Sequence, residues 1–129
     1  MINEISAKRL ADCHPDLIRL FSEAAKHRDF IVTCGYRDHA AQEKAFAEGK
    51  SKVHYPEGKH NKIPSLAVDF VPIKGGQAMW TKEYVLPLAG FIMGLAAALG
   101  VSVTWGGDWD GDFDYDDQKL RDYVHIELK

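Results

Sequence analysis

The sequence predicts one α+β domain with a small, mostly antiparallel sheet flanked by helices. Its length of 129 residues suits a single domain, expected to span residues 1–129. With 46% hydrophobic and 27% charged residues, its composition is that of a folded protein rather than a disordered one. Helical and strand-like segments are mixed without the regular strand–helix–strand rhythm that a parallel sheet requires.

The N-terminal half predicts helices around one strand. Residues 6–10 suit a short helix, and residues 14–27 a clearer one, because Pro15 fits a first helical turn and apolar residues recur at helical spacing. Residues 30–33 form an apolar, partly β-branched run that predicts a strand. Asp38 then predicts the N-cap of a helix that extends to about residue 48.

The C-terminal half predicts more of the sheet and one long helix. Pro72 is expected to end a strand, and Gly100 to end the helix. The predicted segments are a loop over 49–65, a strand over 66–71, a connector over 74–80, a helix over 82–99, a strand over 101–104, an acidic loop over 105–117 and a strand over 123–128.

Charge and cysteine content exclude several classes of protein. The net charge of -3 and the pI near 6 give no overall basic field for nucleic acid or anionic membranes. Cys13 and Cys34 make neither a disulfide framework nor a zinc motif, so we expect two buried thiols. The first residues lack the basic and apolar regions of a signal peptide, which predicts a protein made in the cytoplasm.

One segment is long and apolar enough to suggest a membrane span. Residues 84–103 contain Gly90 and Gly94 in a G-x-x-x-G pattern. However, Pro87, the glycines and many alanines make the segment only weakly hydrophobic. We therefore expect a buried helix followed by a buried strand, and not a membrane protein.

Three residues far apart in the chain form a candidate zinc site: His60, Asp69 and His125. Two imidazoles and one carboxylate are a ligand set of catalytic zinc, whose fourth position is left to water. Asp69 lies between Val68 and Phe70, where an unpaired carboxylate is costly to bury. Taken alone, His60 suits a surface loop and His125 an ordinary core histidine, so the prediction depends on the combination.

Two acids near His125 are candidates for the residue that takes a proton from an activated water. On a regular strand Glu127 shares the face of His125, because side chains alternate with period two. Asp122 would point away from that face unless it lies at a bend just before the strand. Spacing alone slightly favours Glu127.

Other charged residues are weaker candidates. Arg37 follows a strand and a glycine, and its guanidinium suits a substrate carboxylate or a developing oxyanion, although a surface pair with Asp38 is an alternative. His54 is a rival metal ligand. The acidic loop Asp108–Asp117 could bind Ca²⁺, but its glycine is the fourth residue rather than the sixth residue of an EF-hand loop. A solvated acidic loop is favoured.

The motifs together resemble a known family across nearly the whole chain. The segments that carry the resemblance are His14–Leu17, Gly35–Arg37, Gly49–Ser51, Lys59–Asp69, Trp105–Trp109 and Asp122–Leu128. They are similar to the zinc D-alanyl-D-alanine carboxypeptidase family, and within it to the single-domain L-alanyl-D-glutamate peptidases used as phage endolysins. The chain departs from the family pattern at one point. The common pattern has a seven-residue step from the histidine to the aspartate, with a glycine between these two residues, whereas His60 and Asp69 are nine residues apart.

The resemblance implies the hedgehog/DD-peptidase fold and a role for each candidate residue. His60, Asp69 and His125 would bind one catalytic zinc ion. Asp122 would be the catalytic acid and base in place of Glu127, and Arg37 would hold the substrate or its oxyanion.

The implied function is a zinc peptidase that cleaves peptide stems of bacterial peptidoglycan. A phage endolysin would be made in the host cytoplasm and act on the cell wall after release, as a monomer without a nucleic-acid or obligate protein partner. The alternatives are a D-alanyl-D-alanine carboxypeptidase, a bacterial wall-remodelling peptidase, a non-catalytic zinc-binding recognition module, or a small membrane lysis protein built on residues 84–103.

Overall fold

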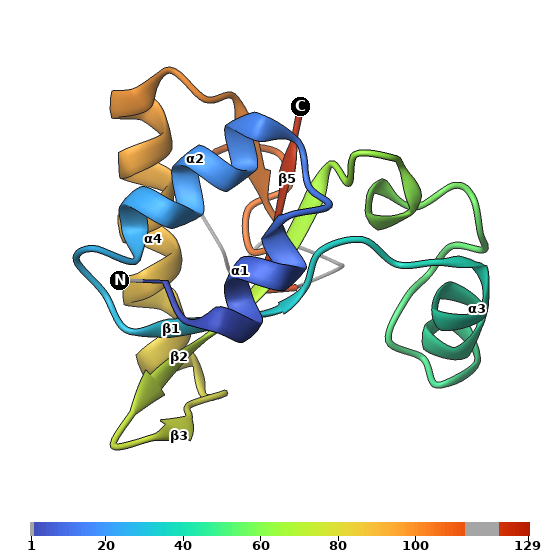
Figure 1. Ribbon diagram of the computed structural model, residues 1–129, viewed down its shortest axis with the longest axis horizontal. Coiled ribbons are helices and arrows are strands. Elements are labelled where there is room, and N and C mark those ends of the chain that lie inside the picture. The colour runs from blue at the N-terminus through green and yellow to red at the C-terminus, as the bar shows by residue number, and fades with distance from the viewer. Residues whose placement is uncertain (1, 113–121) are drawn as a thin grey trace.

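The computed structural model describes residues 2–112 and 122–129 and confirms the α+β prediction (Figure 1). Its main sheet has the strand order β1-β2-β5-β4, and β3 pairs with the outer end of β2. All the pairings between these strands are antiparallel. The strands are β1 (Phe30–Cys34), β2 (Ala67–Lys74), β3 (Gln77–Ala78), β4 (Val103–Trp105) and β5 (His125–Leu128).

Three helices lie at one side of the molecule, and α3 lies apart at the other (Figure 1). The helices are α1 (Glu4–Leu10), α2 (Pro15–Ala24), α3 (His39–Ala47) and α4 (Lys82–Leu99). The predicted N-cap is confirmed, because the Asp38 side chain accepts a hydrogen bond from the Ala41 amide at 2.9 Å. The predicted stop at Gly100 is confirmed as well, since this residue caps α4 with a left-handed φ of 74°.

The hydrophobic core fixes which way the polar side chains of the sheet point. Val68 and Phe70 of β2 are fully buried in the core with residues of α2 and α4. Ile126 of β5 joins the same core. Because strand residues alternate between the two faces, Asp69 and His125 are directed to the opposite face.

The structure differs from the sequence prediction around Pro72. Strand β2 continues through this proline to Lys74, with Pro72 opposite Phe30 of β1. The proline is tolerated because β5 pairs only with Ala67–Asp69. The outer part of β2, which contains Pro72, therefore does not need to donate backbone hydrogen bonds to β5. The predicted connector contains strand β3, which a turn at Gly75 and Gly76 makes possible, since both have positive φ.

Other element ends shift by a few residues. Helix α2 ends at Ala24, three residues earlier than predicted, and β4 and β5 each begin two residues later. The late start of β5 leaves Asp122 in a turn, where its carbonyl accepts from the His125 amide at 3.2 Å. The predicted loop over 49–65 contains a short 3₁₀ helix, η1 (Lys59–Asn61), that buries His60 and Asn61.

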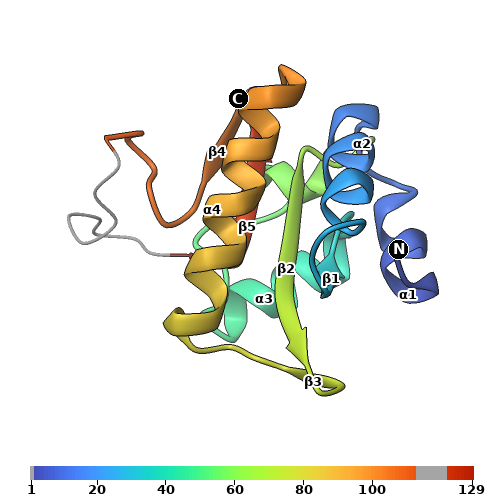
Figure 2. The ribbon, with the colours of Figure 1, turned by 90° about the vertical axis from the view of Figure 1, so that its left-hand side faces the viewer.

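Helix α4 has the length and composition to cross a membrane, judged by those two properties alone. In the structure it runs alongside the sheet (Figure 2). One side of it is buried against the core through Val85, Leu88, Ala89, Ile92 and Ala96. The prediction of a buried helix is therefore only partly confirmed, because 28% of α4 is buried and its other side is not.

Gly35, which directly follows β1, packs closely against residues of α1 and the turn after it. A β-carbon on Gly35 would lie 2.2 Å from the Arg9 carbonyl oxygen and 2.8 Å from the Cys13 sulfur. We predict that Gly35→Ala lowers the free energy of unfolding by about 1–3 kcal/mol, measured by urea denaturation. The matched control is Gly90→Ala in α4, where a β-carbon meets nothing within 4 Å. It should raise that free energy by about 0.5–1 kcal/mol, and equal effects of the two substitutions would contradict this packing.

Candidate metal centre

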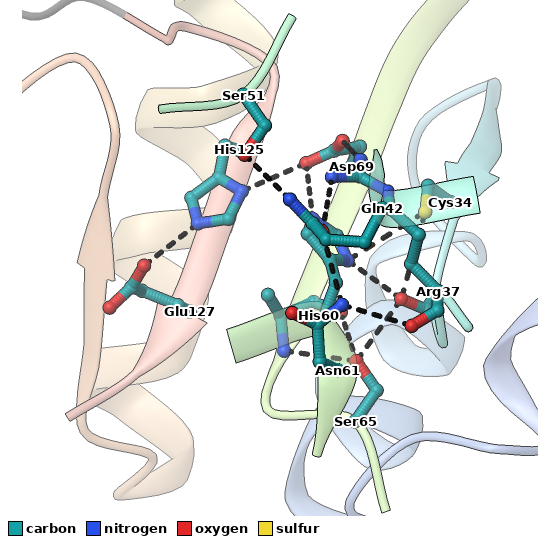
Figure 3. A network of polar contacts seen from close by, with 12 residues as sticks. Cys34, Arg37, Gln42, Ser51, His60, Asn61, Ser65, Asp69, His125 and Glu127 are labelled. Carbon is teal, nitrogen blue, oxygen red and sulfur yellow. Dashed lines mark hydrogen bonds and ion pairs between the residues drawn. The ribbon is translucent and has the colours of Figure 1, made fainter. Parts of the chain in front are cut away.

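The carboxylate of Asp69 is the centre of a polar cluster on the face of the sheet opposite the hydrophobic core. In the strand register Asp69 of β2 lies between Cys34 of β1 and His125 of β5. Its Oδ1 atom lies 3.1 Å from His60 Nε2 and 2.9 Å from His125 Nδ1 (Figure 3). The structure therefore brings together the three residues that the sequence predicts as metal ligands.

Each imidazole is held by a second polar group on its outer nitrogen. His60 Nδ1 lies 2.6 Å from the Gly35 carbonyl oxygen, and His125 Nε2 lies 2.9 Å from Glu127 Oε1. A carbonyl or carboxylate in this position fixes the ring orientation and tautomer of histidines at metal sites. The inner nitrogens, which face Asp69, are thus the ones presented to a cation.

The donor set suits zinc, and the separation of each histidine from Asp69 matches that of two zinc ligands. Two ligands bound at about 2.0–2.1 Å with tetrahedral angles lie about 3.3 Å apart. The measured separations from Asp69 Oδ1, 3.1 Å to His60 and 2.9 Å to His125, are close to that value. Asp69 also shares two groups whose potential ligand atoms all lie within 4.8 Å of one another, one with His60 and Cys34 and one with His125 and Asp122.

The histidines and the carboxylate stabilise each other's charged forms. Burial by itself lowers the pKa of His60, but the charge of Asp69 and hydrogen bonds outweigh it and raise that pKa to about 10. For His125, burial is likewise outweighed by hydrogen bonds to Asp69 and Glu127, which raise the pKa to about 9. Burial would raise the pKa of Asp69, yet the two imidazoles hold it far below its usual range.

The two acids near His125 lie in different surroundings. Glu127 shares the face of His125, as the alternation predicts, and also lies 3.8 Å from Lys59 Nζ. Asp122 reaches the cluster because it sits in the turn before β5, the condition that the sequence analysis set for it. Burial, followed by the negative charge of Asp69, raises the pKa of Asp122 above its ordinary value.

Arg37 lies in the cluster rather than at the surface. Its Nη2 atom is 3.5 Å from Asp69 Oδ2, and its Nη1 atom donates to Gln42 Oε1 at 3.2 Å. The side chain is only 16% exposed. The alternative pairing with Asp38 is not seen, since the described contact of that carboxylate is the helix cap. The guanidinium is therefore available at the edge of the candidate metal site.

The cluster opens into a cleft of about 650 Å³. Its walls include Lys50 and Lys52 from the loop after α3, and the side chains of Trp80 and Trp109. The Trp80 side chain is 60% exposed. The cleft therefore offers both cationic and aromatic groups beside the cluster.

Sequence reasoning missed several residues of the cluster. Cys34 lies with its sulfur 3.7 Å from His60 Nδ1, and its only sequence signal was its place at the end of a strand beside Gly35. Gln42 and Asn61 bond to Arg37, and no spacing pattern indicated them. The rival ligand His54 instead pairs with Glu43 at 3.0 Å on the surface of α3.

The acidic loop is described only as far as residue 112. The carboxylates of Asp108, Asp110 and Asp112 offer ligand atoms within 4.8 Å of one another, and the last two side chains are exposed. The rest of the predicted calcium loop, residues 113–117, lies outside the described part of the chain. Calcium binding there stays a prediction.

Known proteins resemble this chain in sequence. It matches the family described as phage L-alanyl-D-glutamate peptidase over residues 1–129. The L-alanyl-D-glutamate peptidase of Escherichia phage T5 is 30% identical over 135 residues, covering 95% of this chain and 93% of the relative. The peptidoglycan L-alanyl-D-glutamate endopeptidase CwlK of Bacillus subtilis (strain 168) is 28% identical over 137 residues, covering 92% and 74%.

Solved structures resemble the fold over nearly the full length of the chain. The Serratia marcescens L-Ala D-Glu endopeptidase ChiX has a TM-score of 0.80 and 28% identity, and the match covers 98% of this chain and 87% of ChiX. The LdcB LD-carboxypeptidase has a TM-score of 0.54 and 16% identity, covering 99% and 63%, which is a likeness of fold alone. The chain therefore belongs to the phage L-alanyl-D-glutamate peptidase family.

Proposed function

We propose that this protein is a zinc-dependent endopeptidase that cleaves the bond between L-alanine and D-glutamate in the peptide stems of bacterial peptidoglycan. Membership of the peptidase family supports the reaction. The observation on which the proposal depends is the meeting of His60 and His125 at one oxygen of Asp69, with Asp122 beside them. When bound, zinc supplies a Lewis acid that polarises a carbonyl group and makes water more acidic.

The residues of the proposed site are of two kinds: metal ligands, and groups that orient these ligands by hydrogen bonds. His60, Asp69 and His125 would bind zinc through the atoms that now face one another. The Gly35 carbonyl and Glu127 would keep the two rings in the required tautomers. In this assignment the Glu127 carboxylate is already hydrogen-bonded to the His125 ring, which favours Asp122 as the proton acceptor.

Asp122 would act as the general base and then as the general acid. Its raised pKa brings it closer to neutral pH, where proton transfer to and from a carboxyl group is more effective. It would take a proton from the attacking water and pass it to the leaving amine. Arg37 would stabilise negative charge that develops on the carbonyl oxygen, because its guanidinium donors already lie at the edge of the site.

We further propose a phage setting, which the family description and one relative support. A phage protein of this kind would act on the host cell wall after release from the cytoplasm, and the T5 relative supports that role. A D-alanyl-D-alanine carboxypeptidase is the nearest alternative reaction on this fold. A recognition module without catalysis is disfavoured by Asp122, since binding alone requires no proton acceptor.

Zinc binding and catalysis should separate in two variants. We predict that His125→Ala loses bound zinc, whereas Asp122→Asn keeps it and lowers turnover by about 10²- to 10⁴-fold, because only the proton acceptor is removed. Elemental analysis and the rate of muropeptide release measure the two effects. His54→Ala, which changes a surface histidine outside the cluster, should leave both unchanged. Wild-type turnover in Asp122→Asn would contradict the assignment.

The products should identify the bond. Digestion of purified peptidoglycan should release stem peptides whose new amino terminus is D-glutamate, leaving L-alanine on the glycan strand. Mass spectrometry of the released peptides tests this outcome. Free D-alanine as the main product would instead identify a carboxypeptidase.

We predict that protons and zinc compete for the same side chains, so that the stability of the metal-free and the zinc-loaded protein depends on pH in different ways. The raised pKa values of His60 and His125 stabilise the metal-free fold fully below about pH 6.5, and this contribution is lost as the pH rises through about 9 and 10. The lowered pKa of Asp69 contributes above its ordinary value of 3.8 and is lost on acidification. The metal-free protein should therefore be most stable between about pH 4 and 6.5.

Thermal unfolding of EDTA-treated and zinc-loaded protein from pH 5 to pH 10 measures this effect. The midpoint of the metal-free protein should fall above about pH 6.5, and the gain from zinc should grow with pH, because zinc binds deprotonated ligands. The control Asp69→Asn should weaken the slope. A midpoint of the metal-free protein that rises between pH 6.5 and 9 would contradict the charged cluster.

A further inference from the structure

We propose that Gln42 is a positioning residue of the active site, whose buried amide sets the place of the Arg37 guanidinium and joins it to the loop of residues 49–58. Only the kinetic consequences of this proposal rest on the proposed function. The arrangement itself rests on contacts of Arg37, which the sequence predicted as a site residue, with Gln42 and Asn61, which it did not. Gln42 belongs to α3, the helix that lies apart from the other three (Figure 1).

The side chain of Gln42 uses its full hydrogen-bonding capacity. It is 1% exposed. Its Oε1 atom accepts from Arg37 Nη1 at 3.2 Å and from Asn61 Nδ2 at 3.0 Å. Its Nε2 atom donates to Ser51 Oγ and to the Val53 carbonyl oxygen, both at 2.8 Å (Figure 3). A primary amide has two acceptor lone pairs and two donor hydrogens, so each of them has a partner here.

The partners also fix the orientation of the amide. Arg37 and Asn61 present only donors to Gln42, and the Val53 carbonyl presents only an acceptor. A flipped amide would place its NH₂ group against the guanidinium and its oxygen against the carbonyl. The oxygen must therefore face Arg37.

The backbone of Arg37 is held by residues of η1. Its amide donates to the His60 carbonyl at 2.9 Å, and its carbonyl accepts from Asn61 Nδ2 at 3.0 Å. The Arg37 side chain is thus fixed at the main chain by η1 and at the guanidinium by Gln42. This leaves Nη2 directed at Asp69 Oδ2, 3.5 Å away.

The donor side of the amide reaches a segment that lacks helix or strand of its own. No regular element lies between α3 and η1, and this segment supplies Lys50 and Lys52 to the cleft wall. At the end of this segment, Gly58 packs closely against the side-chain amides of Asn61 and Gln42. A β-carbon on Gly58 would lie 2.8 Å from Asn61 Oδ1 and 3.4 Å from Gln42 Oε1. Gln42 therefore joins the cleft wall to Arg37.

A structural role without positioning makes a different prediction from ours. If Gln42 only stabilised the fold, its loss would lower stability and leave turnover per folded molecule unchanged. A positioning residue acts through Arg37, so its removal should matter only while Arg37 is present. A double-mutant cycle with Arg37 distinguishes these two cases.

The decisive variant is Gln42→Met, which has similar volume and cannot replace the four hydrogen bonds. We expect kcat on a purified muropeptide to fall by about 10- to 100-fold, with KM changed less than about threefold, because Arg37 is no longer held in place. Zinc content should not change. In the Arg37→Ala background the same substitution should cost less than about threefold. The matched control is Glu43→Gln, the next residue of α3, which pairs with His54 and should keep kcat within about twofold. A wild-type kcat, or equal factors in both backgrounds, would overturn the proposal.

A second variant and a second readout keep the test independent of folding and of the reaction. Gln42→Asn keeps a buried amide that is one methylene too short to reach both sides, and it should lose kcat in the same way. In ¹⁵N NMR of the wild-type protein, the Arg37 guanidinium should show slowly rotating Nη groups, and Gln42→Asn should abolish that signature. If the wild type releases no muropeptides, the proposed function fails while this spectrum still tests the positioning. An unchanged Arg37 spectrum in Gln42→Asn would refute it.

Discussion

The pairing of the Asp69 carboxylate with two imidazoles and a guanidinium is the interaction on which the rest of the site depends. Asp69 stands in a strand whose neighbours, Val68 and Phe70, are fixed in the core, so the carboxylate cannot turn away from the cleft without moving the core. A charge held there must be paired or bound to a cation. The alternation that buries the hydrophobic residues therefore also builds the polar cluster.

The strand order brings His125 to this cluster. Because β5 lies between β2 and β4, the last residues of the chain face the middle of the sequence, and His125 lies opposite Asp69. The proposed metal centre requires the C-terminal strand to be docked, because His125 belongs to that strand. In our proposals the polar groups around that centre divide their roles: Glu127 orients a ring, Asp122 transfers protons, and Gln42 holds Arg37 in place.

Sequence reasoning succeeded where the signal was local and strong, and failed where tertiary contacts decided the outcome. The Asp38 cap and the α4 helix depend on neighbouring residues and were predicted correctly. Pro72 was expected to end β2, but it lies between the residues of β2 that pair with β5 and those that pair with β3, so neither pairing requires an amide hydrogen there. Burial of His60 could not be foreseen, because it depends on Gly35, 25 residues away. The spacing argument disfavoured a place for Asp122 at the cluster because it assumed a strand that begins two residues too early, and Gln42 carried no periodic signal at all.

The central claim is that one zinc ion is shared by side chains from η1, β2 and β5. The most direct measurement is an anomalous difference map at the zinc absorption edge from crystals of the zinc-loaded protein. We expect one strong peak about 2.0–2.2 Å from His60 Nε2, an Asp69 carboxylate oxygen and His125 Nδ1. A principal peak at another position, with these three side chains bound to no metal, would contradict it.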